Sequence, residues 1–198
     1  MSPLSAPAAT RAPLFWLVLA LPSLALIMRA TQADADPDEL ANWSGQLAMV
    51  LFTMALASTG VAQFAGQHLF RHSRALGLLR HRRALGLAAF GTSLVHLGLY
   101  AVAMERVDAM VAELGAPGIW TGWAALMLLV PLALTSRDAA IRRLGRVWKR
   151  VQRLAWPAMG FALAHTYIVH DGERLALLLA GVLLLVQLLR FIPGRTRP

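Results

Sequence analysis

Two histidines, His96 and His165, lie inside long apolar runs, where an imidazole is costly to place. The first lies in 82-RRALGLAAFGTSLVHLGLYAVAM-104, which has no charged residue between Arg83 and Glu105. An ionisable side chain in such a run usually marks a function. A neutral imidazole can ligate a metal or pass a proton, so the residue type alone leaves both chemistries open.

The composition indicates that these runs cross a membrane. The chain has 198 residues, is 58% hydrophobic and has a mean hydropathy of +0.57, which is too apolar for an ordinary soluble domain. A spanning helix needs about 20 mostly apolar residues. We therefore expect a single domain, residues 1–198, without linker or internal repeat: an all-α integral membrane protein with a six-transmembrane-helix bundle. The expected spans are about 13–31, 47–66, 84–104, 118–134, 155–170 and 175–192.

The charged residues divide between the two ends of these spans. Of the 19 Lys and Arg residues, all but Arg29, Arg106 and Arg174 fall on the side of both termini. Of the 10 Asp and Glu residues, all but Asp138 fall on the other side. The positive-inside rule then predicts a multi-pass protein of the bacterial inner membrane with both termini cytoplasmic. The net charge of +9 fits loops beside membrane lipid, and no nucleic-acid partner is expected.

Two segments allow alternative interpretations. The first span is followed by small residues, 30-ATQADA-35, as a signal peptide would be. We expect an uncleaved anchor, because the run is long for a signal and six spans balance the charges. In the basic loop 135–154, Arg142, Arg146 and Arg153 recur at helical spacing, which fits either an amphipathic helix on anionic lipid or a solvated loop.

The depth of the two histidines favours metal ligation. With both termini inside, their helices run in the same direction, and each imidazole lies about 16 to 18 Å from the cytoplasmic start of its helix. Two imidazoles at one level on parallel helices are typical of a clamp for a b-type haem. The chain has no cysteine, which excludes thiolate ligands and covalent c-type haem. Two histidines merely hydrogen-bonded to neighbouring helices remain the alternative.

Small and polar residues near the histidines fit a flat macrocycle. Five small residues are expected to leave backbone surface exposed to it or to a close helix neighbour: Gly91, Gly98, Gly160, Ala162 and Ala164. Thr92 and Ser93 lie one turn before the first histidine and are expected to orient its ring.

Several short motifs carry a family resemblance. They are 82-RRALGL-87, 95-VHLGLY-100, 135-TS-136, 144-LGRVW-148, 152-QRLAW-156 and 165-HTY-167. In this order and spacing they resemble the ferric reductase-like transmembrane family, and most of all the haem-binding subunits of periplasmic protein-methionine-sulfoxide reductase systems. The resemblance implies that His96 and His165 ligate haem iron. It also implies that Arg82 and Arg83 are cofactor-binding, by neutralising haem propionates or lipid phosphates.

The sequence departs from the family pattern at two positions. Gln152 stands where the family usually has another histidine, and Trp156 where it usually has tyrosine. Glutamine is a poor ligand for haem iron. We therefore expect one haem b per chain, and a second is doubtful.

Two histidines would fill both axial positions of the iron, which favours electron transfer over substrate chemistry. We expect an electron-transfer subunit rather than a self-contained enzyme, since no Gly-rich dinucleotide fingerprint is present. The expected donor is quinol or a separate flavin reductase, with FMN or quinone as a further cofactor left open. By resemblance, the acceptor is a periplasmic molybdopterin methionine sulfoxide reductase. The alternatives are a ferric reductase-like component with another acceptor, or a non-redox membrane scaffold or transporter with a histidine proton relay.

Overall fold

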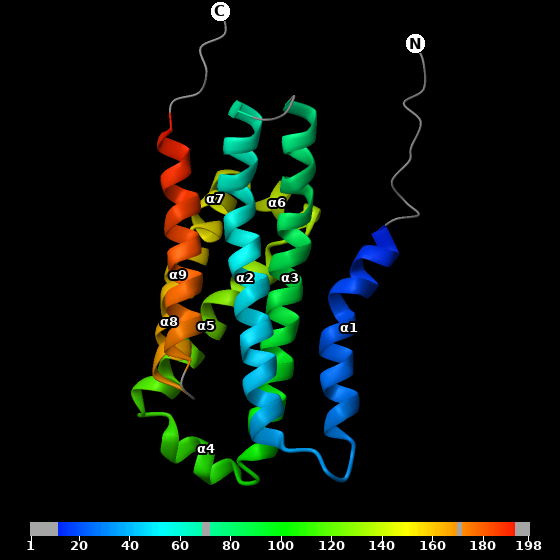
Figure 1. Cartoon of the computed structure of the whole chain (residues 1–198), viewed down its shortest axis with the longest axis vertical. Coiled ribbons are helices and arrows are strands. Elements are labelled where there is room, and N and C mark those ends of the chain that lie inside the picture. Colours follow the sequence, from blue (N-terminus) through cyan, green and yellow to red (C-terminus); the bar gives the residue numbers. More distant parts are fainter. Residues whose placement is uncertain (1–11, 69–71, 170–171, 193–198) are drawn as a thin grey trace, which may run out of the picture.

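The computed structural model describes residues 12–68, 72–169 and 172–192, and these ranges are helical with short connections (Figure 1). The helices are α1 (Ala12–Ala30), α2 (Pro37–His68), α3 (His72–Ala103), α4 (Val107–Glu113), α5 (Pro117–Leu134), α6 (Asp138–Leu144), α7 (Arg146–Gln152), α8 (Ala155–Ile168) and α9 (Glu173–Leu188). A short 3-10 helix, Leu189–Phe191, follows α9. The all-α prediction is confirmed for the part of the chain that the structure describes.

Three helical segments within the described ranges are long and apolar enough to cross a membrane: Pro37–Ala65, His81–Ala103 and Pro117–Leu134. The helices α8 and α9 have 14 and 16 residues, and the apolar part of α1 is Phe15–Ala30. These three are shorter than the roughly 20 residues of a full span. The chain is thus a multi-pass helical membrane protein, and the number of six spans stays a prediction.

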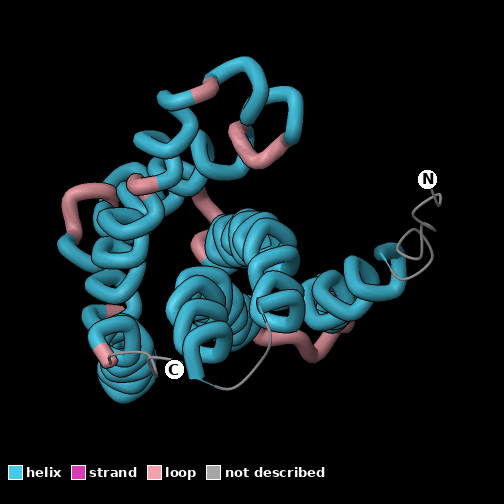
Figure 2. Tube along the Cα trace, turned by 90° about the horizontal axis from the view of Figure 1, so that it is seen from above, coloured by secondary structure: helices cyan, strands magenta, loops and turns pink. Residues whose placement is uncertain are grey.

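Two antiparallel helix pairs form the centre of the bundle. Helices α2 and α3 run side by side along its length, and α5 pairs with α8 (Figures 1 and 2). Helix α9 packs against α2 and α8, whereas α1 lies at the outside against α3. A hydrogen bond between the hydroxyls of Ser23 and Thr92, 2.9 Å long, ties α1 to α3.

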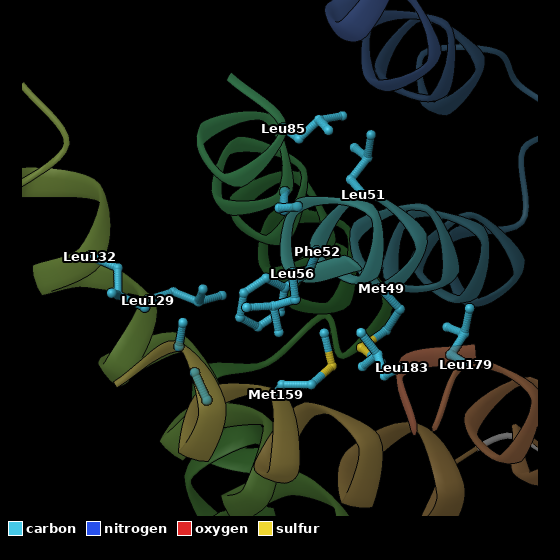
Figure 3. Close-up of a cluster of buried hydrophobic side chains, with 14 residues drawn as sticks. Met49, Leu51, Phe52, Leu56, Leu85, Leu129, Leu132, Met159, Leu179 and Leu183 are labelled. Carbon is cyan, nitrogen blue, oxygen red and sulfur yellow. The ribbon is translucent and has the colours of Figure 1, made fainter. Parts of the chain in front are cut away.

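A buried hydrophobic cluster holds the two pairs together. Figure 3 shows the side chains that meet there, among them Met49, Phe52 and Leu56 of α2, Leu129 of α5, Met159 of α8 and Leu183 of α9. Ala89 and Ala158 are fully buried within the same cluster, and such small residues let neighbouring helix backbones approach closely. The cluster therefore fixes how α2, α3, α5 and α8 face one another.

The described acidic residues other than Asp138 of α6 gather at one end of the bundle, which holds the α1–α2 turn and α4 (Figure 1). Two arginines at this end are paired with aspartates. Arg29 donates to Asp34 at 2.9 Å, and this hydrogen bond lowers the pKa of the Asp34 carboxyl. Arg106 pairs with Asp108 and lowers the pKa of that carboxyl in the same way. Because the other acidic residues at this end outnumber its one further arginine, Arg174, this end has an excess of negative charge.

The basic segment after α5 forms two short helices rather than one continuous amphipathic helix. Helices α6 and α7 meet at Gly145, whose φ of +51° is a backbone conformation that favours glycine. The side chains of Arg142, Arg146 and Arg153 are exposed. The helical spacing in the sequence is thus interrupted at the glycine, and contact with anionic lipid stays a prediction.

The close approach of α2 and α9 gives a test of this packing. A Cβ at Gly60 would lie 2.5 Å from Val186 Cγ1 and 2.8 Å from its carbonyl oxygen, so Gly60→Ala must push the two helices apart. We expect a loss of about 1 to 3 kcal/mol in stability, seen as a lower unfolding temperature in detergent. Gly181→Ala in α9 is the control, because its Cβ would meet nothing within 4 Å. Equal unfolding temperatures for the two variants would contradict this packing.

Candidate cofactor site

The two intramembrane histidines lie opposite each other. His96 belongs to α3 and His165 to α8, and the centroids of their rings are 6.0 Å apart with the ring planes at 73°. Both helices run toward the acidic end of the bundle, so the two imidazoles reach the same level (Figure 1). The structure thus brings together the two residues that the sequence singled out.

Each ring is held by a backbone carbonyl of a neighbouring helix. His96 Nδ1 lies 2.7 Å from the carbonyl oxygen of Ala41, and His165 Nδ1 lies 2.6 Å from that of Gly118. A carbonyl only accepts hydrogen bonds, so Nδ1 must be the donor in both rings. A neutral imidazole that carries its proton on Nδ1 has its lone pair on Nε2. The site therefore presents two Nε2 atoms as potential metal ligands.

A cavity of about 320 Å³ surrounds the pair, between α2, α3, α5 and α8. Its walls are mainly apolar and include Met49, Phe52, Leu97, Leu126 and Leu129. Polar side chains line its other part, which lies toward the acidic end: Asp38, Asn42, Gln46, Tyr100 and Glu113. The Tyr100 hydroxyl donates to Glu113 at 3.0 Å. An apolar cavity with a few convergent polar groups is typical of a cofactor site.

The spacing of the rings fits one metal ion between them. Metal–imidazole bonds of about 2 Å on opposite sides of an ion place the two bonding nitrogens about 4 Å apart. The ring centres lie further out than these nitrogens, which agrees with the 6.0 Å observed. Among the described residues, no group of three or more His, Asp or Glu side chains comes together to hold a metal ion. Two imidazoles can, however, supply the axial ligands of a metal carried by a macrocycle.

Arg82 and Arg83 lie elsewhere. They precede His96 on α3 by 14 and 13 residues, which is about 20 Å along the helix. Neither is among the residues that line the cavity, and Arg83 is paired with Asp138 of α6. Their assignment to a cofactor or to lipid phosphate stays a prediction.

Gln152 takes part in a joint between α5 and α7. Its Nε2 donates to the Thr135 hydroxyl at 3.3 Å, and Trp148 Nε1 donates to the Thr135 carbonyl at 3.0 Å. Gln152 stands where the family usually has another histidine. In this chain it joins the end of α7 to Thr135, which directly follows α5.

The glycines expected to accommodate a macrocycle are the wrong ones. Gly91, Gly98 and Gly160 are exposed, and none of them lines the cavity. Gly45 and Gly122 lie there instead, beside the two rings. Each of these two follows a tryptophan and a hydroxyl residue, a shared pattern that could have identified them from the sequence.

The expected partners of the first ring are also wrong. Thr92 bonds to Ser23 of α1, and the Ser93 hydroxyl donates to the Ala89 carbonyl at 2.9 Å. The groups at His96 Nδ1 come from α2 instead: the carbonyl of Ala41 at 2.7 Å and the hydroxyl of Ser44 at 3.4 Å.

Comparison with known proteins agrees with this architecture. The family described as ferric reductase like transmembrane component matches residues 44–164. The protein-methionine-sulfoxide reductase heme-binding subunit MsrQ of Brucella anthropi is 35% identical over 157 residues, which cover 77% of this chain and 67% of the relative. The MsrQ protein of Deinococcus radiodurans is 34% identical over 181 residues, with coverages of 85% and 84%. That of Brucella ovis is 40% identical over 138 residues, with coverages of 68% and 59%.

The family match begins in α2 and ends one residue before His165, so it includes the α2–α3 pair, α5 and most of α8. This match covers more than half of the chain, and the alignments with the first two relatives exceed 30% identity over at least two thirds of each relative. The chain therefore belongs to the ferric reductase-like transmembrane family.

Proposed function

We propose that this chain is a membrane electron-transfer subunit that carries one b-type haem between His96 and His165. The observation that carries the proposal is the pair of rings 6.0 Å apart, each with Nδ1 on a backbone carbonyl and therefore with Nε2 as the ligand atom. The relatives named as heme-binding subunits support it.

The residues of the chain define what such a site can do. When bound, haem supplies one-electron redox chemistry at its iron. His96 and His165 would both hold the haem iron, which would leave a substrate no coordination position to enter. Phe52, Leu97 and Leu129 form apolar walls of the cavity around the rings, and such a shell lowers the local polarity at a metal site. The site is therefore suited to passing electrons and not to converting a substrate.

The position of the cavity suggests the direction of transfer. It extends to the acidic end of the bundle, through Asp38 and Glu113, and the positive-inside rule assigns that end to the periplasm. The acceptor we propose is a periplasmic molybdopterin methionine sulfoxide reductase. The relatives support a methionine sulfoxide reductase as the partner, since they are named as heme-binding subunits of such a reductase. The proposed donor is quinol or a flavin reductase, with FMN or quinone as the carrier.

Loss of either histidine should abolish the haem signature. We expect the purified chain to show a low-spin b-type spectrum on reduction, and His96→Ala and His165→Ala each to lose the haem or convert it to a high-spin form. His81→Ala is the matched control, since His81 is an exposed histidine on α3 that contacts Phe15 and not the cavity. A colourless protein from haem-replete cells, or an unchanged spectrum in both variants, would refute the proposal.

The haem number should be one per chain. Gln152 is engaged with Thr135, and amide side chains are poor iron ligands. Gln152→Ala is therefore expected to leave the spectrum and the haem content unchanged while it loosens the α5–α7 joint. A pyridine haemochrome assay with a protein determination measures the ratio, and two haems in the unmodified chain would show that other residues supply a second ligand pair.

The proposed orientation places the acidic end of the bundle in the periplasm of the inner membrane. An alkaline phosphatase fusion in the turn 31–36 should be active and a fluorescent-protein fusion at the N-terminus should fluoresce. The N-terminal residues lie outside the described part of the structure, so the fusion tests them directly. The reverse pattern would place the acceptor side in the cytoplasm and overturn the orientation.

A further inference from the structure

Two five-residue segments share one pattern: 41-ANWSG-45 near the start of α2 and 118-GIWTG-122 near the start of α5. Each has a small residue first, tryptophan third, a hydroxyl residue fourth and glycine fifth. We term these two segments the carbonyl seats.

The first position of each carbonyl seat holds a histidine of another helix. The carbonyl of Ala41 accepts from His96 and that of Gly118 accepts from His165, at 2.7 and 2.6 Å. In both cases the histidine lies on the helix that is antiparallel to the seat, α3 against α2 and α8 against α5. The two histidines are thus held by the same kind of contact, each from the helix antiparallel to its own.

The fourth position contributes a second donor to the same carbonyl. The Ser44 hydroxyl donates to Ala41 O at 2.7 Å and also lies 3.4 Å from His96 Nδ1. The Thr121 hydroxyl donates to Gly118 O at 2.8 Å and to Pro117 O at 2.9 Å. Both hydroxyl residues are buried. Each seat carbonyl, which as part of a helix also accepts from the amide four residues later, is therefore shared between an imidazole and a hydroxyl. This sharing limits how strongly it accepts from the imidazole.

The fifth position has to be small. In an α-helix the Cβ tilts toward the N-terminus, so the side chain of residue i+4 covers the carbonyl of residue i. A Cβ at Gly45 would lie 3.1 Å from His96 Nδ1, and one at Gly122 would lie 2.8 Å from His165 Nδ1. Glycine at this position leaves room for the ring to reach the carbonyl.

The third position lies on the outer side of each helix. Trp43 is 55% exposed and Trp120 is 45% exposed. Tryptophans that face outward near the end of a membrane helix are typical of the aromatic belt at the membrane surface. Both seats therefore occupy the same level relative to the membrane, which agrees with the shared level of the two rings.

We propose that the two carbonyl seats are equivalent positioning devices that fix the proton of each histidine on Nδ1 and so deliver Nε2 to the haem. Gly45 and Gly122 admit the rings, and the hydroxyls of Ser44 and Thr121 moderate the basicity of the ligands. The inference about the ligands rests on the proposed function, whereas the position of the imidazole proton is a property of the polypeptide itself.

The role of Gly45 and Gly122 is tested by measuring which nitrogen of each histidine ring carries the proton. The full-length chain is labelled with 15N-histidine and measured by NMR in detergent under reducing conditions, where low-spin ferrous haem is diamagnetic. The signals of the two histidines are assigned by their absence in His96→Ala and His165→Ala. In the unmodified chain both should carry the proton on Nδ1.

Gly122→Ala should remove the Nδ1-proton signal of His165 and weaken haem retention about 10- to 100-fold, as is usual when a partner of a metal-bound histidine is lost. Gly45→Ala should do the same to His96 to a smaller extent, because its contact is longer. Gly160→Ala and Gly91→Ala, on the two histidine helices, are the controls, since a Cβ there would meet nothing within 4 Å.

The role of the Ser44 and Thr121 hydroxyls is tested by measuring the midpoint potential of the haem. Ser44→Ala or Thr121→Val leaves the carbonyl with one donor fewer, so the imidazole bond strengthens and the more basic ligand favours ferric iron. The midpoint potential should shift downward in each variant and further in the double variant. These variants retain the glycines, so they provide the test if an alanine in place of glycine prevents folding.

The outcomes separate the two proposals. A colourless chain whose two rings still carry the proton on Nδ1 would overturn the haem and leave the seats standing. A haem-containing chain with the proton on Nε2 in either ring would overturn the seats. The seats would equally fail if Gly122→Ala matched Gly160→Ala in NMR spectrum and haem content, or if both hydroxyl variants kept the original potential.

Discussion

The backbone carbonyl of a membrane helix is the contact on which the candidate site depends. A polar ring inside the bilayer needs a partner within the protein, because no bulk water is present to supply one. A helical carbonyl already accepts from the amide four residues later, but it has a second lone pair to offer. When the imidazole takes that lone pair, the two helices must approach closely, and the residue four positions on must be glycine. The path of α3 along α2, and of α8 along α5, follows from this requirement.

The two helix pairs are alike at the acidic end and different at the other end. At the acidic end, the seats beginning at Ala41 and Gly118 hold one histidine each. Toward the opposite end, α5 leads into α6 and α7, and Thr135 joins Trp148 and Gln152 there. Side chains that close this joint cannot at the same time serve as ligands. The difference between the two ends is the physical reason for proposing one haem and not two.

The sequence predicted the features that depend on the type of side chain. Apolar runs identified the membrane helices, and the cost of burying an imidazole identified His96 and His165 as a pair. It could not identify their partners, because a backbone carbonyl is present at every position and leaves no mark in the sequence. The sequence analysis chose glycines on the two histidine helices themselves, Gly91, Gly98 and Gly160. The glycines that lie beside the rings, Gly45 and Gly122, belong to the helices opposite. The break at Gly145 was missed for a related reason, since helical spacing of arginines does not reveal a positive φ.

The depth of the rings bears on the choice of electron donor. His96 lies 13 residues beyond Arg83, about 20 Å along α3, and the lining of the cavity includes residues of the acidic end but not the arginine. With one haem at this depth, a flavin bound at the cytoplasmic surface would be separated from the iron by most of that length. A quinol, which moves within the bilayer, can approach the bundle at the level of the rings themselves. Under the proposed function, the single histidine pair favours quinol over a cytoplasmic flavin reductase as the donor. The acidic end, where the cavity reaches Asp38 and Glu113, is then the proposed docking side of the acceptor.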